Sequence, residues 1–186
     1  MTNILLQTMS AFCDASVNPA LWPDALAALA EATDADTVLT AEHSVGGDAG
    51  RVTHAWGVDT RLLVTYPDAA APLSQWLQDA DAAGTAPRVW EGEDIVIDGR
   101  PLSRSAFAAD WLQAQNLHHV LIGVAGGSDG RIDLVLLGRT RRHGRFPSEA
   151  VQRLGDLLPH LHRRLTAGEA AELARTVQGA AATALR

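Results

Sequence analysis

The sequence predicts an α+β protein in which helices flank an antiparallel β-sheet. Two apolar runs of strand length, residues 117–124 and 132–138, flank the glycine-rich stretch 126–130, which is the pattern of a β-hairpin. A second pair of short runs, residues 36–43 and 51–58, is joined by another glycine-rich stretch. Apolar residues at helical spacing precede and follow these runs, which predicts the flanking helices.

Length and composition indicate one compact domain. The chain has 186 residues, of which 47% are hydrophobic and 20% charged, and a single domain typically takes about 100–200 residues. We predict a domain over residues 1–166 and an accessory helix over residues 167–186. The net charge of −7, from 22 acidic and 15 basic residues, argues against a nucleic-acid-binding surface.

Cysteine usage and hydropathy predict a cytoplasmic protein with no membrane partner. Cys13 is the single cysteine, which excludes an internal disulfide framework and a cysteine-based zinc site within one chain. The N-terminus lacks the basic and apolar regions of a signal peptide. No window approaches the roughly 20 continuous apolar residues of a membrane span.

Two helices are expected at the start of the chain. Residues 2–16 carry an apolar stripe, with Thr2 as a candidate N-cap. Asn18 followed by Pro19 is a typical helix start, because the asparagine side chain can cap and proline suits the first helical position. The second helix should end near Asp34.

The middle of the chain predicts strands and then a helical stretch. In the strand at 51–58, simple alternation would place Val52 on the same face as His54 and Trp56. Residues 59–79 have helical spacing, interrupted by prolines. Residues 81–101 are rich in glycine, proline and acidic residues, and we predict a long crossover with one short strand; such a connection is often a binding loop.

The second half predicts a helix, the hairpin and a long final helix. Residues 104–112 form an amphipathic segment, and the final helix should begin near Pro147 and continue to Leu165. Beyond it, apolar residues recur at spacings of three and four, a heptad-like pattern that predicts a C-terminal signalling or dimerisation helix and a homodimer.

This order of elements resembles the GAF/PAS-type sensor domains. Two segments resemble more specifically the N-terminal sensory domain of LuxR-type helix-turn-helix transcriptional regulators. The first is residues 104–112 followed by Leu117-His118-His119, and the second runs from Arg139 through a basic loop and Phe146 to residues 157–161. Pro147 departs from the polar helix cap expected there.

The resemblance implies a sensory function rather than a catalytic one. It implies that the domain binds a small organic effector and relays the signal through its C-terminal helix. DNA would be reached only through a helix-turn-helix domain that this chain does not contain. The alternative is a protein-interaction or dimerisation module with a filled core and no ligand.

Aromatic residues supply the candidate ligand site, because ligand pockets are lined by aromatic side chains and a few polar groups. The alternative for each is packing between helices and sheet. The candidate ligand-binding residues are Trp56, Tyr66, Trp76, Trp90, Phe107, Trp111 and His119.

The histidines do not predict a metal site, and no cofactor is expected. His118 and His119 should point to opposite faces of a strand, so they cannot share one metal ion. His43 and His54 lie on neighbouring predicted strands and could meet. The other histidines have no spacing that supports a metal or haem site.

No catalytic motif is present, and the sequence predicts that the chain is not an enzyme. It has no P-loop, dinucleotide-binding glycine motif, nucleophile elbow or His-Glu-x-x-His sequence. Cys13 lies on an apolar stripe, where a thiol stays protonated and inert. The arginine-rich stretch 139–145 is too short for nucleic acid in an acidic chain and is interpreted as a loop that docks a neighbouring domain or subunit.

Overall fold

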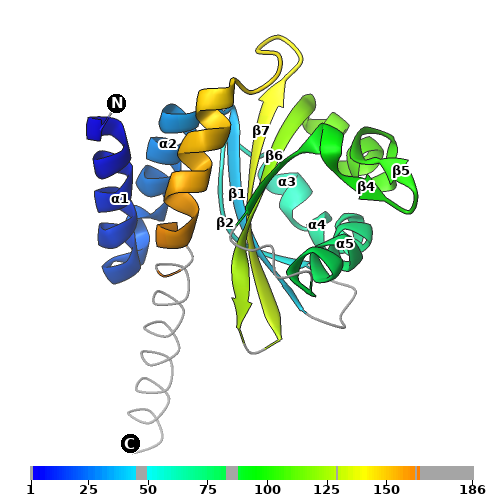
Figure 1. Cartoon of the computed structure of the whole chain (residues 1–186), viewed down its shortest axis with the longest axis horizontal. Coiled ribbons are helices and arrows are strands. Elements are labelled where there is room, and N and C mark those ends of the chain that lie inside the picture. The colour runs from blue at the N-terminus through cyan, green and yellow to red at the C-terminus, as the bar shows by residue number, and fades with distance from the viewer. Residues whose placement is uncertain (1, 45–49, 83–87, 129, 162, 164–186) are drawn as a thin grey trace, which may run out of the picture.

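A five-stranded antiparallel sheet forms the centre of the protein (Figure 1). The computed structural model describes residues 2–44, 50–82, 88–128, 130–161 and 163. The strands lie in the order β2-β1-β7-β6-β3, and each neighbouring pair is antiparallel. Their bounds are β1 Thr37–Ser44, β2 Gly50–Trp56, β3 Arg88–Glu91, β6 Leu117–Ser128 and β7 Arg131–Thr140. The predicted α+β class is confirmed.

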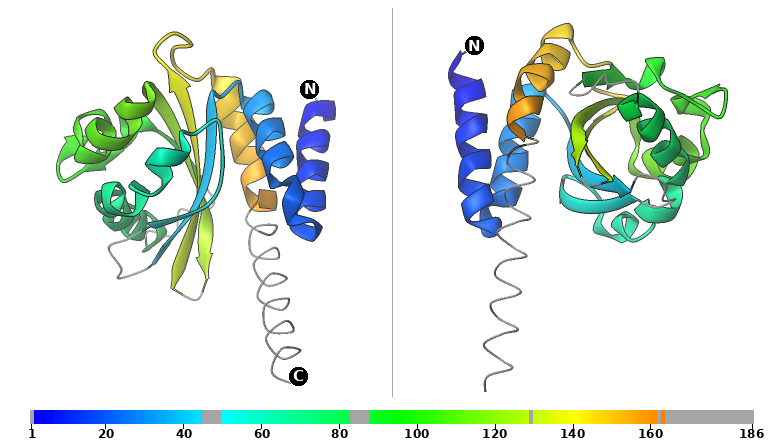
Figure 2. Two further views of the ribbon diagram at one scale, coloured as in Figure 1. Left: turned by 180° about the vertical axis from the view of Figure 1, so that it is seen from behind. Right: turned by 60° about the horizontal axis from the view of Figure 1, so that its bottom comes forward.

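Three helices cover one face of the sheet: α1 (Thr2–Val17), α2 (Trp22–Thr33) and a C-terminal helix over residues 148–161 (Figures 1 and 2). Their apolar stripes pack on the side chains of the central strands that point to this face. The buried core of this layer includes Phe12, Trp22, Leu26, Leu29, Val38, Leu121, Val135, Leu137, Leu154 and Leu158.

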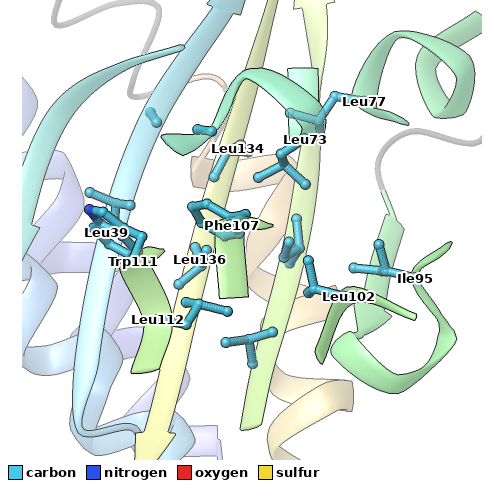
Figure 3. Close-up of a cluster of buried hydrophobic side chains, with 14 of the residues drawn as sticks. Leu39, Leu73, Leu77, Ile95, Leu102, Phe107, Trp111, Leu112, Leu134 and Leu136 are labelled. Carbon is cyan, nitrogen blue, oxygen red and sulfur yellow. The ribbon is translucent and has the colours of Figure 1, made fainter. Parts of the chain in front are cut away.

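Short helices cover the opposite face. They are α3 (Thr60–Leu63), α4 (Tyr66–Ala69) and α5 (Ala71–Ala82), followed later in the chain by the 3₁₀ turns η2 (Gly92–Asp94) and η3 (Leu102–Arg104). A π-helical segment, η4 (Ala108–Leu112), leads through η5 (Gln113–Gln115) into β6. The second core lies beneath these elements, and Figure 3 shows Phe107, Trp111 and Leu112 of this layer packed with Leu39, Leu134 and Leu136 of the sheet.

The expected helix starts and ends are present at the beginning of the chain. The Asn18 side chain accepts a hydrogen bond of 3.2 Å from the amide of Ala20, as the Asn-Pro pair predicted. The chain makes one 3₁₀ turn, η1 (Pro19–Leu21), before α2 begins at Trp22. Asp34 ends α2 in the left-handed conformation at φ +55°.

The predicted crossover contains more regular structure than one short strand. Residues 88–91 form β3, which pairs with β6 and becomes one edge of the main sheet. A separate two-stranded hairpin, β4 (Val96–Ile97) with β5 (Arg100–Pro101), follows. The local sequence pattern does not reveal such an edge strand, because the strand with which β3 forms hydrogen bonds lies about thirty residues later in the sequence.

Alternation in β2 is broken by a β-bulge, so the predicted face of Val52 is wrong. The register shifts between Thr40 and Ala41 of β1, whose partners in β2 are His54 and Val52. The extra residue turns Val52 towards the core of the short-helix layer, whereas Trp56 packs in the other core.

The residues that would transmit a signal lie partly outside the described part of the chain. The predicted helix at 167–186 and the last residues of the predicted final helix, 164–165, lie outside the described residues. Among the described residues, no helix is long and apolar enough to cross a membrane.

Candidate ligand-binding site

A cavity of about 300 Å³ lies between the η2–η5 segment and the beginning of β6. Its apolar lining belongs to the core beneath the short helices, and its polar lining comes from the 3₁₀ turns, the loop after β7 and the beginning of β6. The volume is at the lower end of the range for small-molecule sites. The lining residues are Gly92, Glu93, Leu102, Ser103, Ala108, Leu112, Gln113, Leu117, His118, Val120 and Arg141.

Local backbone features create the cavity. Asn116 adopts the left-handed conformation at φ +59° and turns the chain from η5 into β6. A register shift between Leu117 and His119 leaves His118 without a partner on β7, and this bulged residue lines the cavity. Val120, two residues further along the strand, lines the same cavity, and the placement of His118 and His119 on opposite faces stays a prediction.

Gly92 allows the wall of the cavity to approach the sheet. A Cβ atom at this position would lie 2.6 Å from Val120 Cγ2, so any larger residue would push η2 away from β6. The cavity wall beside β6 thus depends on a glycine in the acidic stretch of the crossover.

Among the polar side chains that line the cavity, Glu93 has partners within the described part of the protein and four others do not. Glu93 lies 3.2 Å from Nε of Arg145 and 3.4 Å from Nδ1 of His119, so its carboxylate has an ion-pair partner in Arg145 and a hydrogen-bond partner in His119. The side chains of Ser103, Gln113, His118 and Arg141 make no hydrogen bond or ion pair with any described residue. These four groups are free to bind a ligand.

Three of the predicted aromatic residues form one fully buried cluster beside the cavity. Tyr66 lies 5.2 Å from Trp111 and 6.1 Å from Phe107 between ring centroids, and Phe107 stacks on Trp111 at 5.5 Å. The indole Nε1 of Trp111 donates to the carbonyl oxygen of Leu62 at 2.9 Å. The cluster fixes the π-helical segment, whose Ala108 and Leu112 line the cavity.

The other predicted site residues are dispersed. Trp76 and Trp90 make an edge-to-face contact of 5.2 Å and are both half-buried. Trp56 packs in the core on the other face of the sheet, and His119 contacts Glu93 at the rim. None of the seven predicted side chains lines the cavity, so their direct contact with a ligand remains a prediction.

A polar network lies within the short-helix core. His43 has its Nδ1 atom 2.7 Å from the hydroxyl of Ser74 and its Nε2 atom 3.0 Å from the hydroxyl of Tyr66. One neutral tautomer satisfies all three groups: Nδ1–H donates to Ser74, Ser74 donates to the carbonyl oxygen of Ala70, and Tyr66 donates to Nε2. Burial lowers the pKa of His43 to about 4 and raises that of Tyr66.

This network has a structural role, although a serine beside a histidine is also the arrangement of an activated nucleophile. His43, Tyr66 and Ser74 are each at most 1% exposed, and the cavity does not reach them. The predicted meeting of His43 with His54 does not occur, because His54 stacks on Trp22 on the other face at 4.0 Å. Sequence reasoning missed the network because α4 and α5 meet β1 only in the folded chain.

A second charged cluster lies at the end of β7, where Arg139 contacts the end of α2 and the loop before the C-terminal helix. Arg139 is 6% exposed and donates to the carbonyl oxygen of Arg145 at 2.6 Å and to the carboxylate of Asp34 at 2.9 Å. Its guanidinium also lies 5.3 Å from the centre of the Phe146 ring. The arginine-rich stretch therefore anchors the loop that leads into the C-terminal helix.

No protein-family model and no curated protein matches the sequence. Solved structures do match the fold. The VqsR LBD domain from Pseudomonas aeruginosa aligns with 87% of this chain and 94% of its own, at 12% identity and a TM-score of 0.65. A phycoerythrobilin-bound GAF domain from a cyanobacterial phytochrome aligns with 92% of this chain and 97% of its own, at 13% identity and a TM-score of 0.56. The chain has a GAF-like fold.

GAF-like folds occur in proteins of more than one kind. The free methionine-R-sulfoxide reductase from Neisseria meningitidis, solved with its substrate, aligns with 90% of this chain and 89% of its own, at 17% identity and a TM-score of 0.53. The fold therefore does not decide between binding and catalysis, and function has to be argued from the site. Within the described residues, no group of three or more histidine, cysteine, aspartate or glutamate side chains could hold a metal ion.

Proposed function

We propose that this chain is the sensory domain of a LuxR-type transcriptional regulator and binds a small organic effector. The observation that carries the proposal is the cavity beside β6, which combines free polar groups with apolar side chains within a GAF-like fold. The LuxR-type assignment is supported by the sequence resemblance, and the GAF-like fold on which it rests is shared with the VqsR LBD domain.

The cavity has the composition of an effector site. Leu102, Leu112, Leu117 and Val120 offer an apolar surface, and the other lining residues add polar groups to it. Apolar burial would supply the affinity of such a site, and a few polar contacts would orient the ligand. The Tyr66–Phe107–Trp111 cluster would hold the wall in place behind them.

The loop after β7 provides a route from the cavity to the C-terminal helix. Arg141 lines the cavity, and Arg145 binds Glu93 at its rim. The carbonyl oxygen of Arg145 accepts from Arg139, and Phe146 packs in the core beside the C-terminal helix. An effector that contacts Arg141 or displaces Glu93 would shift this loop only through its different affinity for the two loop arrangements.

Homodimerisation is part of the proposal, and we assign it to the face covered by α1, α2 and the C-terminal helix. Leu6 of α1 is 58% exposed, and a second cavity of about 220 Å³ lies between α1 and the C-terminal helix. This second cavity is lined by Met9, Phe12, Cys13, His160, Leu161 and Arg163. A partner helix laid across it would bury this apolar surface.

A ligand screen tests the sensory function. We expect at least one compound in a broad panel of small organic metabolites to raise the thermal unfolding midpoint of the protein, because a ligand bound only to the folded state stabilises it. Ser103→Trp should abolish that increase, since the indole would fill the cavity from its exposed rim.

The matched control is Ser148→Trp, which makes the same change at an exposed position outside the cavity and should leave the ligand response intact. Circular dichroism establishes that both variants fold. A panel without any stabilising compound, or a response that survives Ser103→Trp, would contradict the effector site.

The alternative function is an interaction module that works without a ligand. The full burial of Tyr66, Phe107 and Trp111 favours it, because these rings fill the centre of the short-helix core. The same screen separates the two functions: a dimer that forms normally and binds no member of the panel would support the module.

A further inference from the structure

The free groups in the cavity beside β6 identify the class of effector. We propose that the cavity takes a small amphipathic carboxylic acid, with its carboxylate on Arg141 and His118 and its carbon chain on the apolar side chains. This inference rests on the proposed sensory function and names the ligand class of the same site.

Arg141 is the main anchor for an anion. A guanidinium has two parallel N–H groups that match the two oxygens of a carboxylate. The side chain lines the cavity, is exposed, and has no ion-pair partner in the described parts of the chain. Hydrogen bonds between charged partners are about twice as strong as neutral ones.

Glu93 does not occupy this anchor. Its carboxylate already contacts Arg145 at 3.2 Å and His119 at 3.4 Å. Arg145 also lies 3.8 Å from Glu91, so the acidic groups at the rim share a cation other than Arg141. One unpaired cation beside one paired carboxylate favours a monoanion over a dianion such as a phosphate ester.

The rest of the lining fits the remainder of such a molecule. His118 stands on the bulge at the start of β6, where its ring can donate to the second oxygen of the carboxylate. Leu102, Leu112 and Leu117, each at most 4% exposed, present carbon atoms to the interior of the cavity. The volume of about 300 Å³ limits the ligand to a short chain or a single ring.

The test is an NMR titration of the full chain with hexanoate, hexanamide and hexyl phosphate. These probes share their carbon chain and differ in the polar end. We expect hexanoate to shift the amide resonances of the cavity residues and to bind about tenfold or more tightly than hexanamide. Arg141→Ala should remove that preference by weakening hexanoate, while Arg141→Lys should keep part of it.

Arg142→Ala is the matched control, because Arg142 is an exposed neighbour with the same charge that does not line the cavity. It should leave the preference for hexanoate unchanged. Equal loss in both variants would mean that net charge attracts the acid, which would overturn the assigned anchor.

The remaining outcomes separate the ligand class from the function. Hexanamide binding in the cavity as tightly as hexanoate would overturn the carboxylate assignment and leave the cavity as a sensory site. Tightest binding of hexyl phosphate, dependent on Arg141, would replace the carboxylate with a phosphate. Shifts outside the cavity for all three probes, combined with a metabolite screen without hits, would overturn the proposed function itself.

Discussion

At the scale of single residues, His43 shows how burial sets the chemistry of a side chain. The imidazole is enclosed by Tyr66 and Ser74, which satisfy both of its nitrogens in the neutral form. Gly50 stands opposite on β2, and a Cβ atom there would lie within 3 Å of the imidazole ring. The site is therefore built for a neutral histidine of fixed orientation.

This environment predicts a loss of stability in mild acid. The pKa of His43 is about 4 in the folded state and 6.5 in its ordinary state, so between these values the unfolded chain binds more protons. The free energy of unfolding should therefore be full above pH 6.5 and fall by roughly 3 kcal/mol as the pH approaches 4. Urea unfolding at a series of pH values measures it.

His43→Gln is the comparison for this prediction. The variant should be less stable at neutral pH, because the network loses a hydrogen-bonding partner, and its stability should change less between the two pH values. Asp36 contributes stability that is lost only as the pH falls below its ordinary pKa of 3.8. Burial alone would raise the pKa of its carboxyl, but hydrogen bonds from Thr140 and the nearby His143 outweigh that effect and lower it. A variant with the same pH dependence as the natural sequence would show that His43 is not the titrating group.

At the scale of elements, the contact between β6 and the C-terminal helix depends on a glycine in the strand. Gly123 lies on β6 opposite Leu158, and a Cβ atom there would lie 2.8 Å from Leu158 Cδ1. Leu154 and Leu158 fill the space that the glycine leaves. Any signal that reaches the C-terminal helix has to pass a closely packed surface, where small shifts change many contacts.

Two glycine-to-alanine substitutions should therefore have opposite effects. Gly123→Ala should lower the free energy of unfolding by roughly 1–3 kcal/mol, because the added methyl group overpacks the interface. Gly155→Ala, on the exposed side of the C-terminal helix, meets no atom within 4 Å and should raise it by roughly 0.5–1 kcal/mol through helix propensity. Urea unfolding of both variants checks the signs. Equal signs would contradict the close packing.

At the scale of the whole molecule, the sheet separates two layers of helices. The short-helix layer holds the cavity, and the layer of α1, α2 and the C-terminal helix carries the apolar surface proposed for dimerisation. The loop from Arg141 to Phe146 passes from one layer to the other over the end of the central strand β7 (Figure 1). Under the proposed function, an effector bound on one face would influence a partner on the other through this loop.

The proposed dimer predicts that one exposed leucine matters and one exposed valine does not. Leu6→Glu places a charge on the outer surface of α1 and should shift the protein towards monomer in sedimentation velocity experiments. Val64→Glu, at a residue 79% exposed after α3 in the other layer, should leave the association unchanged. Loss of the dimer in both variants, or in neither, would contradict this interface.

The α+β class and nearly all the main elements were predictable from the sequence, because strand alternation, helical spacing, and the Asn18-Pro19 start are local signals. Tertiary structure decided the rest. The edge strand β3, the bulges at β2 and His118, and the His43 network depend on partners distant in the chain, which local pattern does not record. For the same reason the sequence selected the largest aromatic side chains as ligand contacts, whereas folding buried Tyr66, Phe107 and Trp111 against one another and left Arg141 and His118 beside the cavity.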